Sequence, residues 1–363
     1  MTIKEKRKTN PRRRVLIKLI FGLVLIVSVL AVGIQALRPT GAQIVYIAPD
    51  DNGYDAIWLA DVNDPENPRQ LTHHEGKYIA DLQVSAENSI IFYTLFDTYD
   101  ANFAEFRIIN LDTGNHEAIQ VCETIACKDF QLHPNGQWLT FEDFSAPSNR
   151  IYAYNLITSE KYLVFDFGRA QLYSHFPKWV GDTNSLIFRI ANDNDYDEFA
   201  FYDLEEQAIV DTITVDTSIA LNFSHNGSLY AYYPIRLQHT LRSIRDINDP
   251  EISYQIPYPV YDWHPNNEEL LMVDYFYNEN NTENIFFTDI YLFDMLTGEY
   301  EILLSLENSS PQPTFNADGS QILYSAFVPN ENYYQLMILD METREEIILP
   351  IVGGRPQWVN GGR

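Results

Sequence analysis

The sequence predicts an all-β protein folded as a β-propeller, a ring of four-stranded blades. One observation behind this prediction is a short unit that recurs along the chain, of which Phe130–Phe141, FQLHPNGQWLTF, is the clearest copy. The other is the spacing of the copies, which return every 40–52 residues. That period is typical of a propeller blade and too long for a leucine-rich or helical repeat.

Each copy of the unit has the chemistry of a β-hairpin. An apolar residue comes first, a turn of the form x-Pro-Asn-Gly or a variant of it follows, and a run of alternating apolar residues comes last. Proline fixes φ at the second turn position, asparagine tolerates the bridge or left-handed region, and glycine adopts positive φ without a Cβ penalty. The strands on either side of the turn must therefore fold back on each other.

The apolar residue before each turn, here called the reference residue, marks the number of repeats. The reference residues are Val84, Leu132, Trp179, Phe223, Trp263, Phe315 and Trp358. Seven reference residues predict a ring of seven blades.

Two stretches of the chain carry a family resemblance. In DNGYDAIWLADVNDPENPRQLTHHEG (51–76) a strand ends in an aspartate-led turn and an Arg-x-Leu-Thr strand follows, and PTFNADGSQILYS (313–325) is a Pro-x-Phe hairpin with an Asp-Gly turn. Both resemble the repeats of TolB-like, WD40-like (PD40-type) β-propellers, and the resemblance covers roughly residues 42–363. The best-known members of this family have six blades, so six is the alternative to the seven counted in this chain.

The two ends of the repeat region are incomplete in complementary ways. Three expected strands precede Val84 without a reference residue of their own: 42–48, 56–62 and 68–72. Trp358, in contrast, is followed by no further strand. We expect Gln357–Asn360 to form the innermost strand of the first blade beside the strand that contains Val45, with Trp358 buried. This pairing would close the ring and leave no exposed sheet edge at either end.

Charge is distributed unevenly along the 363 residues, which carry a formal net charge of −27. Residues 1–40 contain nine of the 24 basic residues and one of the 51 acidic residues, so the remainder has a net charge of −35. A surface this acidic repels phosphate backbones. The composition therefore predicts no nucleic-acid partner.

The basic N-terminus precedes an apolar segment that is long enough to cross a membrane. Residues 15–37, VLIKLIFGLVLIVSVLAVGIQAL, contain Lys18 as the single charge. Because the preceding residues 1–14 are rich in Lys and Arg, we expect them to be cytoplasmic. A short linker, 38–41, then leads to the propeller at 42–363 outside the cytoplasm. The alternative is a cleaved signal peptide, which would also take the propeller out of the cytosol.

The loops from the second to the third strand of each blade are longer than the tight turns and are rich in acids, amides and tyrosines. In propellers these loops share one face, called here the loop face, whereas the tight turns lie on the opposite turn face. Long loops on a rigid scaffold often bind partners, and tyrosine offers contact area at low entropic cost. We expect a protein, peptide or glycan that is cationic or neutral and polar to bind there, unless the rings fill gaps between blades. The candidate tyrosines are Tyr54, Tyr99, Tyr196, Tyr277, Tyr333 and Tyr334.

One loop has the alternating oxygen donors of some calcium sites. These are Asp193, Asp195, Asp197 and Glu198 in NDNDYDE. The alternative is a solvated turn, and no other cofactor is expected. His133 and His264 occupy a position in the x-Pro-Asn turns, where capping of the turn is expected rather than metal binding.

Cys122 and Cys127 are the two cysteines of the chain and enclose four residues between two expected blades. Outside the cytoplasm such a pair forms a disulfide, and the alternative is a pair of reduced thiols.

Enzyme motifs are absent from the sequence. There is no Gly-x-Ser-x-Gly elbow, no phosphate-binding glycine-rich loop and no His-Glu-x-x-His. The sequence therefore favours a membrane-anchored, extracytoplasmic, non-catalytic recognition scaffold. The alternative is a calcium-assisted hydrolase or lyase with carboxylates at the mouth of the channel.

Overall fold

The part of the chain that the structure describes lies within residues 42–360. The computed structural model describes residues 42–85, 87, 89–97, 104–121, 127–144, 147–168, 175–192, 196–216, 218–234, 242–249, 251–277, 286–329, 331 and 333–360. In these residues 28 strands and no helix are found. The predicted cytoplasmic, membrane-spanning and linker segments, 1–14, 15–37 and 38–41, lie outside the described residues. Within the described ranges, no helix has the length and apolar character needed to cross a membrane.

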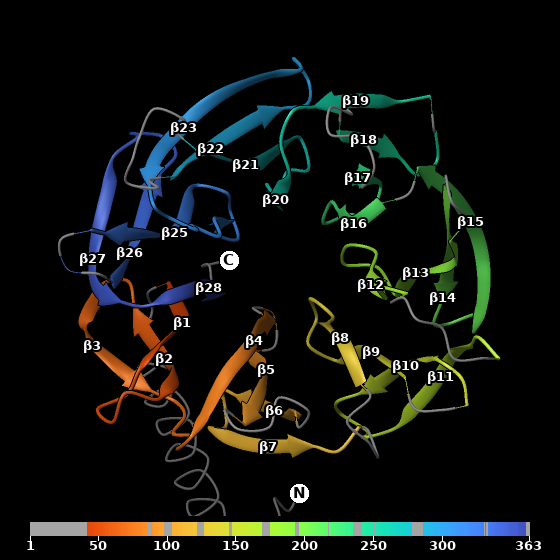
Figure 1. The fold of residues 1–363 in the computed structure, drawn as a ribbon, viewed down its shortest axis with the longest axis horizontal. Helices are drawn as coiled ribbons and strands as arrows, with labels where there is room; N and C mark the ends of the chain where they lie inside the picture. The colour runs from red at the N-terminus through yellow and green to blue at the C-terminus, as the bar shows by residue number, and fades with distance from the viewer. Residues whose placement is uncertain are drawn as a thin grey trace, which may run out of the picture. The chain divides into compact units, whose positions relative to one another are not determined.

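The strands form seven four-stranded antiparallel sheets arranged around a common axis (Figure 1). The predicted seven-bladed propeller is therefore confirmed, and the six-bladed alternative is wrong for this chain. We number the blades in chain order, so that blade 1 contains the first strand of the ring.

The strands of each blade are given from the innermost to the outermost. Blade 1 contains β28 (Gly354–Asn360), β1 (Gln43–Pro49), β2 (Asp55–Asp61) and β3 (Asp64–Gln70). Blade 2 contains β4 (Lys77–Ser85), β5 (Ile90–Asp97), β6 (Ala104–Asn110) and β7 (Asn115–Ile119). Blade 3 contains β8 (Cys127–Leu132), β9 (Trp138–Asp143), β10 (Arg150–Asn155) and β11 (Lys161–Asp166). Blade 4 contains β12 (Lys178–Trp179), β13 (Ser185–Asn192), β14 (Tyr196–Asp203) and β15 (Ala208–Asp216).

The remaining three blades have the same order. Blade 5 contains β16 (Ser218–Phe223), β17 (Leu229–Pro234), β18 (Arg242–Asp246) and β19 (Ser253–Ile256). Blade 6 contains β20 (Val260–Trp263), β21 (Glu269–Tyr277), β22 (Phe286–Asp294) and β23 (Glu299–Glu307). Blade 7 contains β24 (Thr314–Phe315), β25 (Gln321–Val328), β26 (Tyr333–Asp340) and β27 (Glu346–Val352).

In blades 2–7 the recurrent turn joins the first two strands, as its chemistry predicts. In blade 3 the backbone N–H of His133 donates to Trp138 at 2.8 Å, and the N–H of Gly136, whose φ is 66°, donates back to His133 at 2.7 Å. The His133 side chain caps this turn, because its Nδ1 accepts the N–H of Asn135 at 3.0 Å. Its Nε2 donates to the carbonyl of Thr183 in blade 4 at 2.9 Å, so the capped turn is also tied to the next blade.

A second cap occurs where the third strand of every blade ends. The last residue of that strand is an aspartate or asparagine whose Oδ1 accepts a backbone N–H from the following turn, at 2.7–3.3 Å. This is the aspartate-led turn of the resemblance, present in all seven blades. The seven residues are Asp61, Asn110, Asn155, Asp203, Asp246, Asp294 and Asp340.

Two of these caps have a resolved electrostatic effect. The backbone N–H of Leu296 lowers the pKa of Asp294. The backbone N–H and the hydroxyl of Thr343 lower the pKa of Asp340. In both turns the donors favour the ionised carboxylate.

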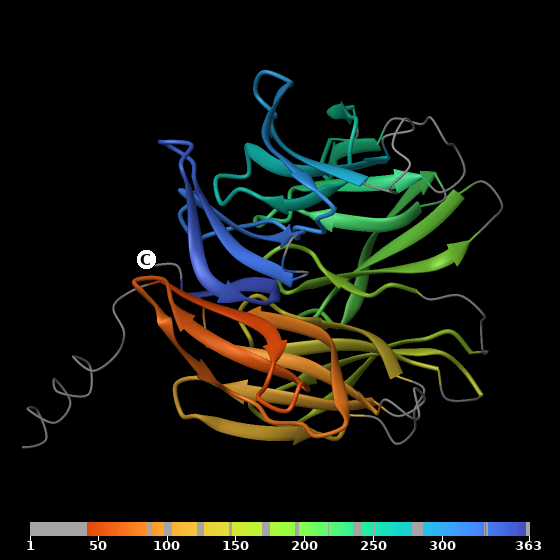
Figure 2. The ribbon, with the colours of Figure 1, turned by 60° about the vertical axis from the view of Figure 1, so that its left-hand side comes forward.

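The ring is closed by β28, which pairs antiparallel with β1 (Figure 2). Ile44 lies opposite Trp358 and Val45 lies opposite Gln357 in this ladder. The closing strand begins at Gly354, earlier than the expected Gln357. Trp358 is 7% exposed, and its Nε1 donates to the carbonyl of Thr314 in blade 7 at 3.2 Å.

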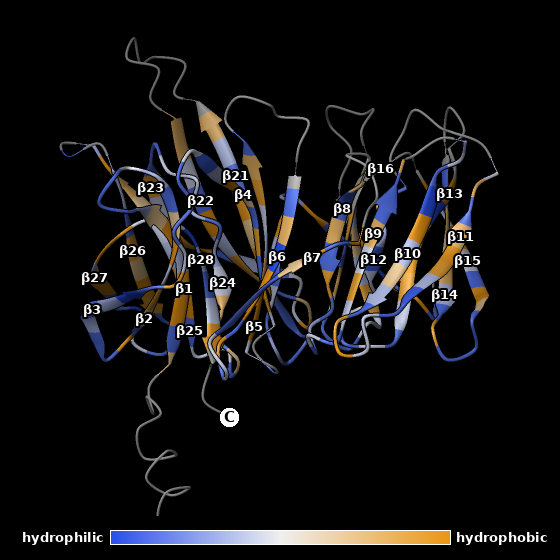
Figure 3. Ribbon diagram, turned by 90° about the horizontal axis from the view of Figure 1, so that it is seen from below, coloured by the Kyte–Doolittle hydropathy of each residue, from blue (hydrophilic) through white to orange (hydrophobic). Residues whose placement is uncertain are grey.

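The core is divided into seven clusters, one between each pair of neighbouring blades. Hydrophobic residues therefore lie along the strands, whereas many of the connections between strands are hydrophilic (Figure 3). Successive residues of a strand point to opposite faces of its sheet. Ile44 accordingly belongs to the cluster that contains Leu323 of blade 7, whereas Val45 belongs to the cluster that contains Ile91 of blade 2. Each blade thus depends on both neighbours.

We expect Trp358→Ala to destabilise the ring by about 3–5 kcal/mol, because it leaves a cavity in the junction between blades 7 and 1. Deletion of residues 355–363 should cost at least as much, since it also removes the ladder with β1. The measurement is urea denaturation of the full chain. Trp358→Phe, which keeps most of the apolar contact, is the matched control and should lose less. Melting of the truncated protein within a degree or two of the intact one would contradict the closure.

The turn aspartates predict a pH dependence. A carboxylate whose pKa is lowered by folding stabilises fully above its unfolded pKa of about 3.9, and this stabilisation is lost as the pH falls through the folded pKa. The double variant Asp294→Asn/Asp340→Asn should therefore lose less stability than the wild type between pH 7 and pH 3. Asparagine still caps such a turn, as Asn110 does, but does not titrate. Urea denaturation at each pH is the measurement, and Glu299→Gln, which alters an exposed carboxylate beside one turn, should follow the wild type. If the double variant loses as much stability as the wild type between pH 7 and pH 3, the two turn aspartates do not cause the pH dependence.

Candidate functional site

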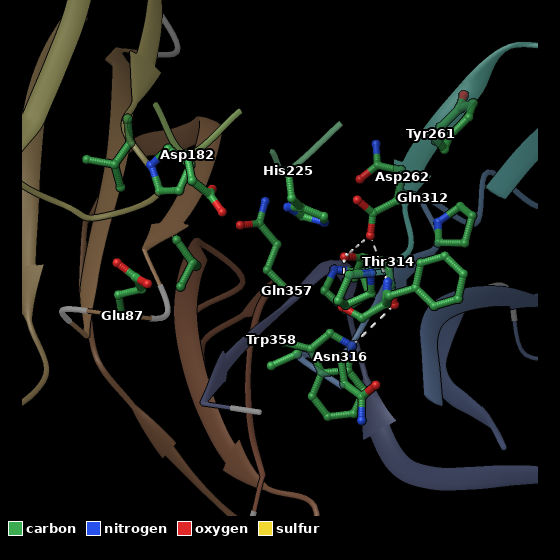
Figure 4. A pocket seen from close by; sticks show the side chains of 18 residues that line it. Glu87, Asp182, His225, Tyr261, Asp262, Gln312, Thr314, Asn316, Gln357 and Trp358 are labelled. Atoms are coloured by element: carbon green, nitrogen blue, oxygen red, sulfur yellow. Dashed lines mark hydrogen bonds between the residues drawn. The ribbon is translucent and has the colours of Figure 1, made fainter. Parts of the chain in front are cut away.

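A cavity of about 770 Å³ lies at the centre of the ring and is lined by residues of all seven blades. It is therefore part of the central channel of the propeller. Its polar side chains include Glu87, Asp182, His225, Tyr261, Asp262 and Gln357 (Figure 4). Several of these residues come from the turns between first and second strands, so the cavity lies toward the turn face. A volume of this size is within the range of roughly 300–1,000 Å³ that is usual for ligand pockets.

The wall of the channel carries a polar residue immediately before every reference residue. We call these seven residues the channel belt. They are all half-buried and comprise Gln83, Gln131, Lys178, Asn222, Asp262, Thr314 and Gln357. The sequence contained this signal, since the position before the reference residue is polar in every repeat, but only the ring shows that these residues meet.

Hydrogen bonds at the channel belt join the innermost strands of neighbouring blades. Gln357 Nε2 donates to the Leu82 carbonyl at 2.7 Å and thereby links blade 1 to blade 2. Gln83 makes two bonds to blade 3, because its Nε2 donates to the Phe130 carbonyl at 2.8 Å and its Oε1 accepts the Leu132 N–H at 2.7 Å.

The other junctions are bridged in related ways. Lys178 Nζ donates to the Leu221 carbonyl of blade 5 at 2.8 Å. Asp262 Oδ2 accepts the Phe315 N–H at 2.8 Å and the Thr314 hydroxyl at 2.9 Å, both in blade 7. At two junctions the indole N–H of a reference tryptophan instead donates to the backbone carbonyl of a channel-belt residue. These pairs are Trp179 with Gln131 at 3.0 Å and Trp358 with Thr314 at 3.2 Å.

The junction between blades 5 and 6 has the longest of the belt bonds that join two blades. Asn222 Nδ2 donates to the Val260 carbonyl at 3.4 Å. Trp263 is 2% exposed, yet its Nε1 has no hydrogen-bond partner among the described residues. The corresponding nitrogens of Trp179 and Trp358 are both bonded.

The electrostatics of the channel follow from burial. Burial raises the pKa of Asp262, against the opposing effects of the nearby His225 and of its three hydrogen-bond donors. In blade 4, burial lowers the pKa of the Lys178 ammonium group. Burial also lowers the pKa of His133, against its bond to Thr183 and the charges of Asp182 and Glu87.

The tyrosines predicted for the loop face do not line this cavity where they are described. Tyr54 is half-buried in the loop between β1 and β2 of blade 1, and Tyr333 and Tyr334 are half-buried at the start of β26. Tyr196 begins β14 and Tyr277 ends β21, but their side chains are not described. Tyr99 lies outside the described residues. A recognition role for these tyrosines stays a prediction.

The predicted calcium ligands are only partly described. Asp193 and Asp195 lie outside the described residues. Asp197 is fully buried and its Oδ2 lies 3.5 Å from Nη1 of Arg189, and Glu198 follows it in β14. In the described part of the chain no group of three His, Cys, Asp or Glu side chains is placed to hold a metal ion. A calcium ion in this loop stays a prediction.

Cys127 begins β8 and is disulfide-bonded. Its predicted partner, Cys122, lies outside the described residues.

A buried acid–histidine pair, which sequence reasoning missed, joins blade 3 to the chain entering blade 4. Glu142 and His175 are both fully buried, and the imidazole Nδ1 is hydrogen-bonded to Glu142 Oε1. The His175 N–H donates to Glu142 Oε2 at 2.8 Å, and the imidazole stacks on Phe167 at 3.5 Å between ring centroids. Neither residue lines the channel cavity, so this geometry favours a structural role.

Comparison with known proteins identifies the fold. No protein-family model and no curated protein matches the sequence. Among solved structures, the chain is similar to an oligogalacturonate lyase from Vibrio parahaemolyticus, with a TM-score of 0.57 and 15% identity over 83% of this chain and 87% of that one. It is also similar to the β-propeller domain of the Trilobed protease from Pyrococcus furiosus, with a TM-score of 0.54 and 14% identity over 78% and 86%.

TolB from Acinetobacter baumannii is also matched, with a TM-score of 0.49 and 15% identity over 88% of this chain and 67% of that one. At such identities a structural match shows the β-propeller fold alone. The matched proteins differ in activity, and a fold shared by proteins of different activity does not decide function.

Truncation of different channel-belt side chains should reduce the stability of the protein by different amounts. Gln83→Ala should destabilise the protein by about 2–3 kcal/mol, because it removes two interblade bonds and leaves the Leu132 N–H without its acceptor. Asn222→Ala removes one long bond and should cost less than about 1 kcal/mol. Urea denaturation of the full chain measures both, with the exposed Glu117→Ala as control. Equal costs for the two belt variants would show that these bonds do not stabilise the junctions.

Proposed function

We propose that the protein is a membrane-anchored, extracytoplasmic recognition scaffold that binds a protein, peptide or glycan without catalysing a reaction. The observation that carries this proposal is the channel cavity, to which every blade contributes. A pocket with convergent polar groups on a rigid scaffold is the usual form of a binding site. The absence of nucleophile and phosphate-binding motifs from the sequence favours binding over catalysis.

The rigidity of the cavity supports a binding role. A smaller cavity of about 210 Å³ adjoins the main one and shares Leu132, Pro134, Asp182 and His225 with it. Six of the seven channel-belt residues, all except Gln83, line one of these two cavities. Because five of these six side chains, all except that of Gln131, are hydrogen-bonded across blades, little conformational freedom remains to be lost when a ligand binds. Preorganisation of this kind increases affinity.

The test is partner capture by the full-length protein in detergent, with a variant that fills the cavity. Ala317 is exposed on the turn of blade 7 and lines the cavity, so Ala317→Trp should block it without disturbing the core. We expect this variant to lose at least tenfold in captured partner while its melting temperature stays unchanged. Glu206→Trp, on an exposed turn outside the cavity, is the matched control. If Ala317→Trp still captures the partner fully and the double variant Tyr54→Ala/Tyr334→Ala does not, the partner binds the loop face and not the cavity.

The proposed location rests on the sequence of residues 1–41. Residues 15–37 have the length and apolar character of a spanning helix, and the basic residues 1–14 favour the cytoplasmic side. A reporter fused after Arg363 is expected to be active when it is an enzyme that works outside the cytoplasm, such as a periplasmic phosphatase. Activity of a reporter that functions only in the cytosol would overturn the orientation.

A further inference from the structure

We propose that His133 is an acid-sensitive latch, which holds the turn of blade 3 closed between its two neighbouring blades and releases it when the imidazole is protonated. By latch we mean His133 together with the two hydrogen bonds of its ring. The proposal concerns how the ring of blades responds to pH, so it goes beyond the proposed function and does not depend on what the cavity binds. It is carried by the tautomer that these two bonds impose on a buried imidazole.

The two ring nitrogens of His133 have opposite hydrogen-bonding roles. A backbone N–H can only donate, so Nδ1 must accept the N–H of Asn135 at 3.0 Å. A carbonyl can only accept, so Nε2 must donate to Thr183 at 2.9 Å. Only the neutral ring with its proton on Nε2 makes both bonds. His133 is 1% exposed, so water has little access to replace either partner.

Protonation of this ring would set two donors against each other. The imidazolium carries a proton on Nδ1 as well as on Nε2. The added N–H would point at the N–H of Asn135, and the cap of the turn would be lost. The imidazole also packs edge to face against Trp179, with 4.5 Å between ring centroids, so it cannot rotate to another acceptor without losing this contact. The turn must therefore open to accommodate the charged ring.

This turn is tied to the blades on both sides. The Pro134 carbonyl accepts the hydroxyl of Ser85 in blade 2 at 2.5 Å, and Thr183 belongs to the turn of blade 4. Pro134 also lines both channel cavities. Opening of the turn would therefore loosen two blade junctions and change the wall of the channel.

The charges around His133 do not cancel this response. Glu87 on the turn of blade 2 and Asp182 on that of blade 4 favour the imidazolium, but burial opposes it more strongly and lowers the pKa of His133. The closed turn therefore binds fewer protons than the open one. The stabilisation by His133 is complete above its unfolded pKa of about 6.5, and it is lost as the pH falls from that value to the folded pKa.

A histidine at the same turn position in blade 6 provides a matched control. His264 Nδ1 accepts the N–H of Asn266 at 3.1 Å, as His133 does in its own turn. Glu269 Oε2, however, lies 3.9 Å from this nitrogen, whereas the corresponding residue of blade 3 is Trp138. A proton added to His264 Nδ1 meets a carboxylate. We therefore expect acid to open the turn of blade 3 and not that of blade 6.

The test is hydrogen–deuterium exchange measured by mass spectrometry on the full-length protein in detergent, at pH 7.5 and pH 5.5. Protection factors are corrected for the intrinsic effect of pH on amide exchange. A proton bound by the open turn alone shifts the opening equilibrium by up to about tenfold per pH unit, so the peptide 130–141 should lose about threefold to tenfold in protection on acidification. The corresponding peptide of blade 6, residues 261–272, should keep its protection.

The variant His133→Asn removes the titrating group and keeps the cap, because an asparagine side chain accepts the backbone N–H two residues further on. It should abolish the acid response of the peptide 130–141, and each variant is compared with its own protection at pH 7.5. His264→Asn should leave that response as it is in the wild type.

Equal protection of the peptide 130–141 at the two pH values in the wild type overturns the proposal. The same loss of protection in His133→Asn as in the wild type also overturns it. An equal loss in the peptides of blades 3 and 6 would show that acid acts on the whole ring and not on this turn. This comparison of two peptides within the wild type tests the latch even if a variant does not fold.

Discussion

The antiparallel pairing of β28 with β1 is the contact on which the rest of the ring depends. Every blade is apolar on both faces, as the opposite burial of Ile44 and Val45 illustrates, so a blade without two neighbours would expose one of its faces. A linear row of such blades has two exposed faces, whereas a ring has none. Closure by hydrogen bonds between distant parts of the chain therefore converts seven similar hairpin repeats into one cooperative unit.

Much of this architecture could be predicted from the sequence because it is local. The turn around His133 and the strand-ending aspartates are encoded within each repeat, and the repeats were numerous enough to count. Blade 5 was harder, since β18 and β19 are short and their sequences, RSIRD and SYQI, alternate weakly. The outermost strand of blade 1 was expected at 68–72, but β3 spans Asp64–Gln70. Thr72 instead uses its hydroxyl to accept the Ile57 N–H at 2.9 Å.

The candidate site could not be predicted in the same way, because its residues are distant in sequence. Glu87, Asp182 and Asp262 belong to different repeats and line one cavity only because of the curvature of the ring. Sequence reasoning instead selected the longer loops, whose composition is conspicuous. The polar residue before each reference residue was visible but had no evident meaning without knowledge that this position faces the axis. The channel belt thus joins the blades and, at most positions, lines the cavities. Substitutions at these positions are therefore expected to alter the blade junctions, whereas Glu87 and Asp182 lie on turns outside the ladders.

The closing ladder also makes the order of the blades along the chain partly arbitrary. Gln43 lies opposite Asn360, so the first and last described strands of the ring end side by side at one face. A short peptide could join them, and new ends could be opened in an exposed turn such as that between β22 and β23, without altering any blade junction. The contacts of the propeller are therefore circular, with both ends of the ring in blade 1. Circular permutation offers a way to move these ends to another blade.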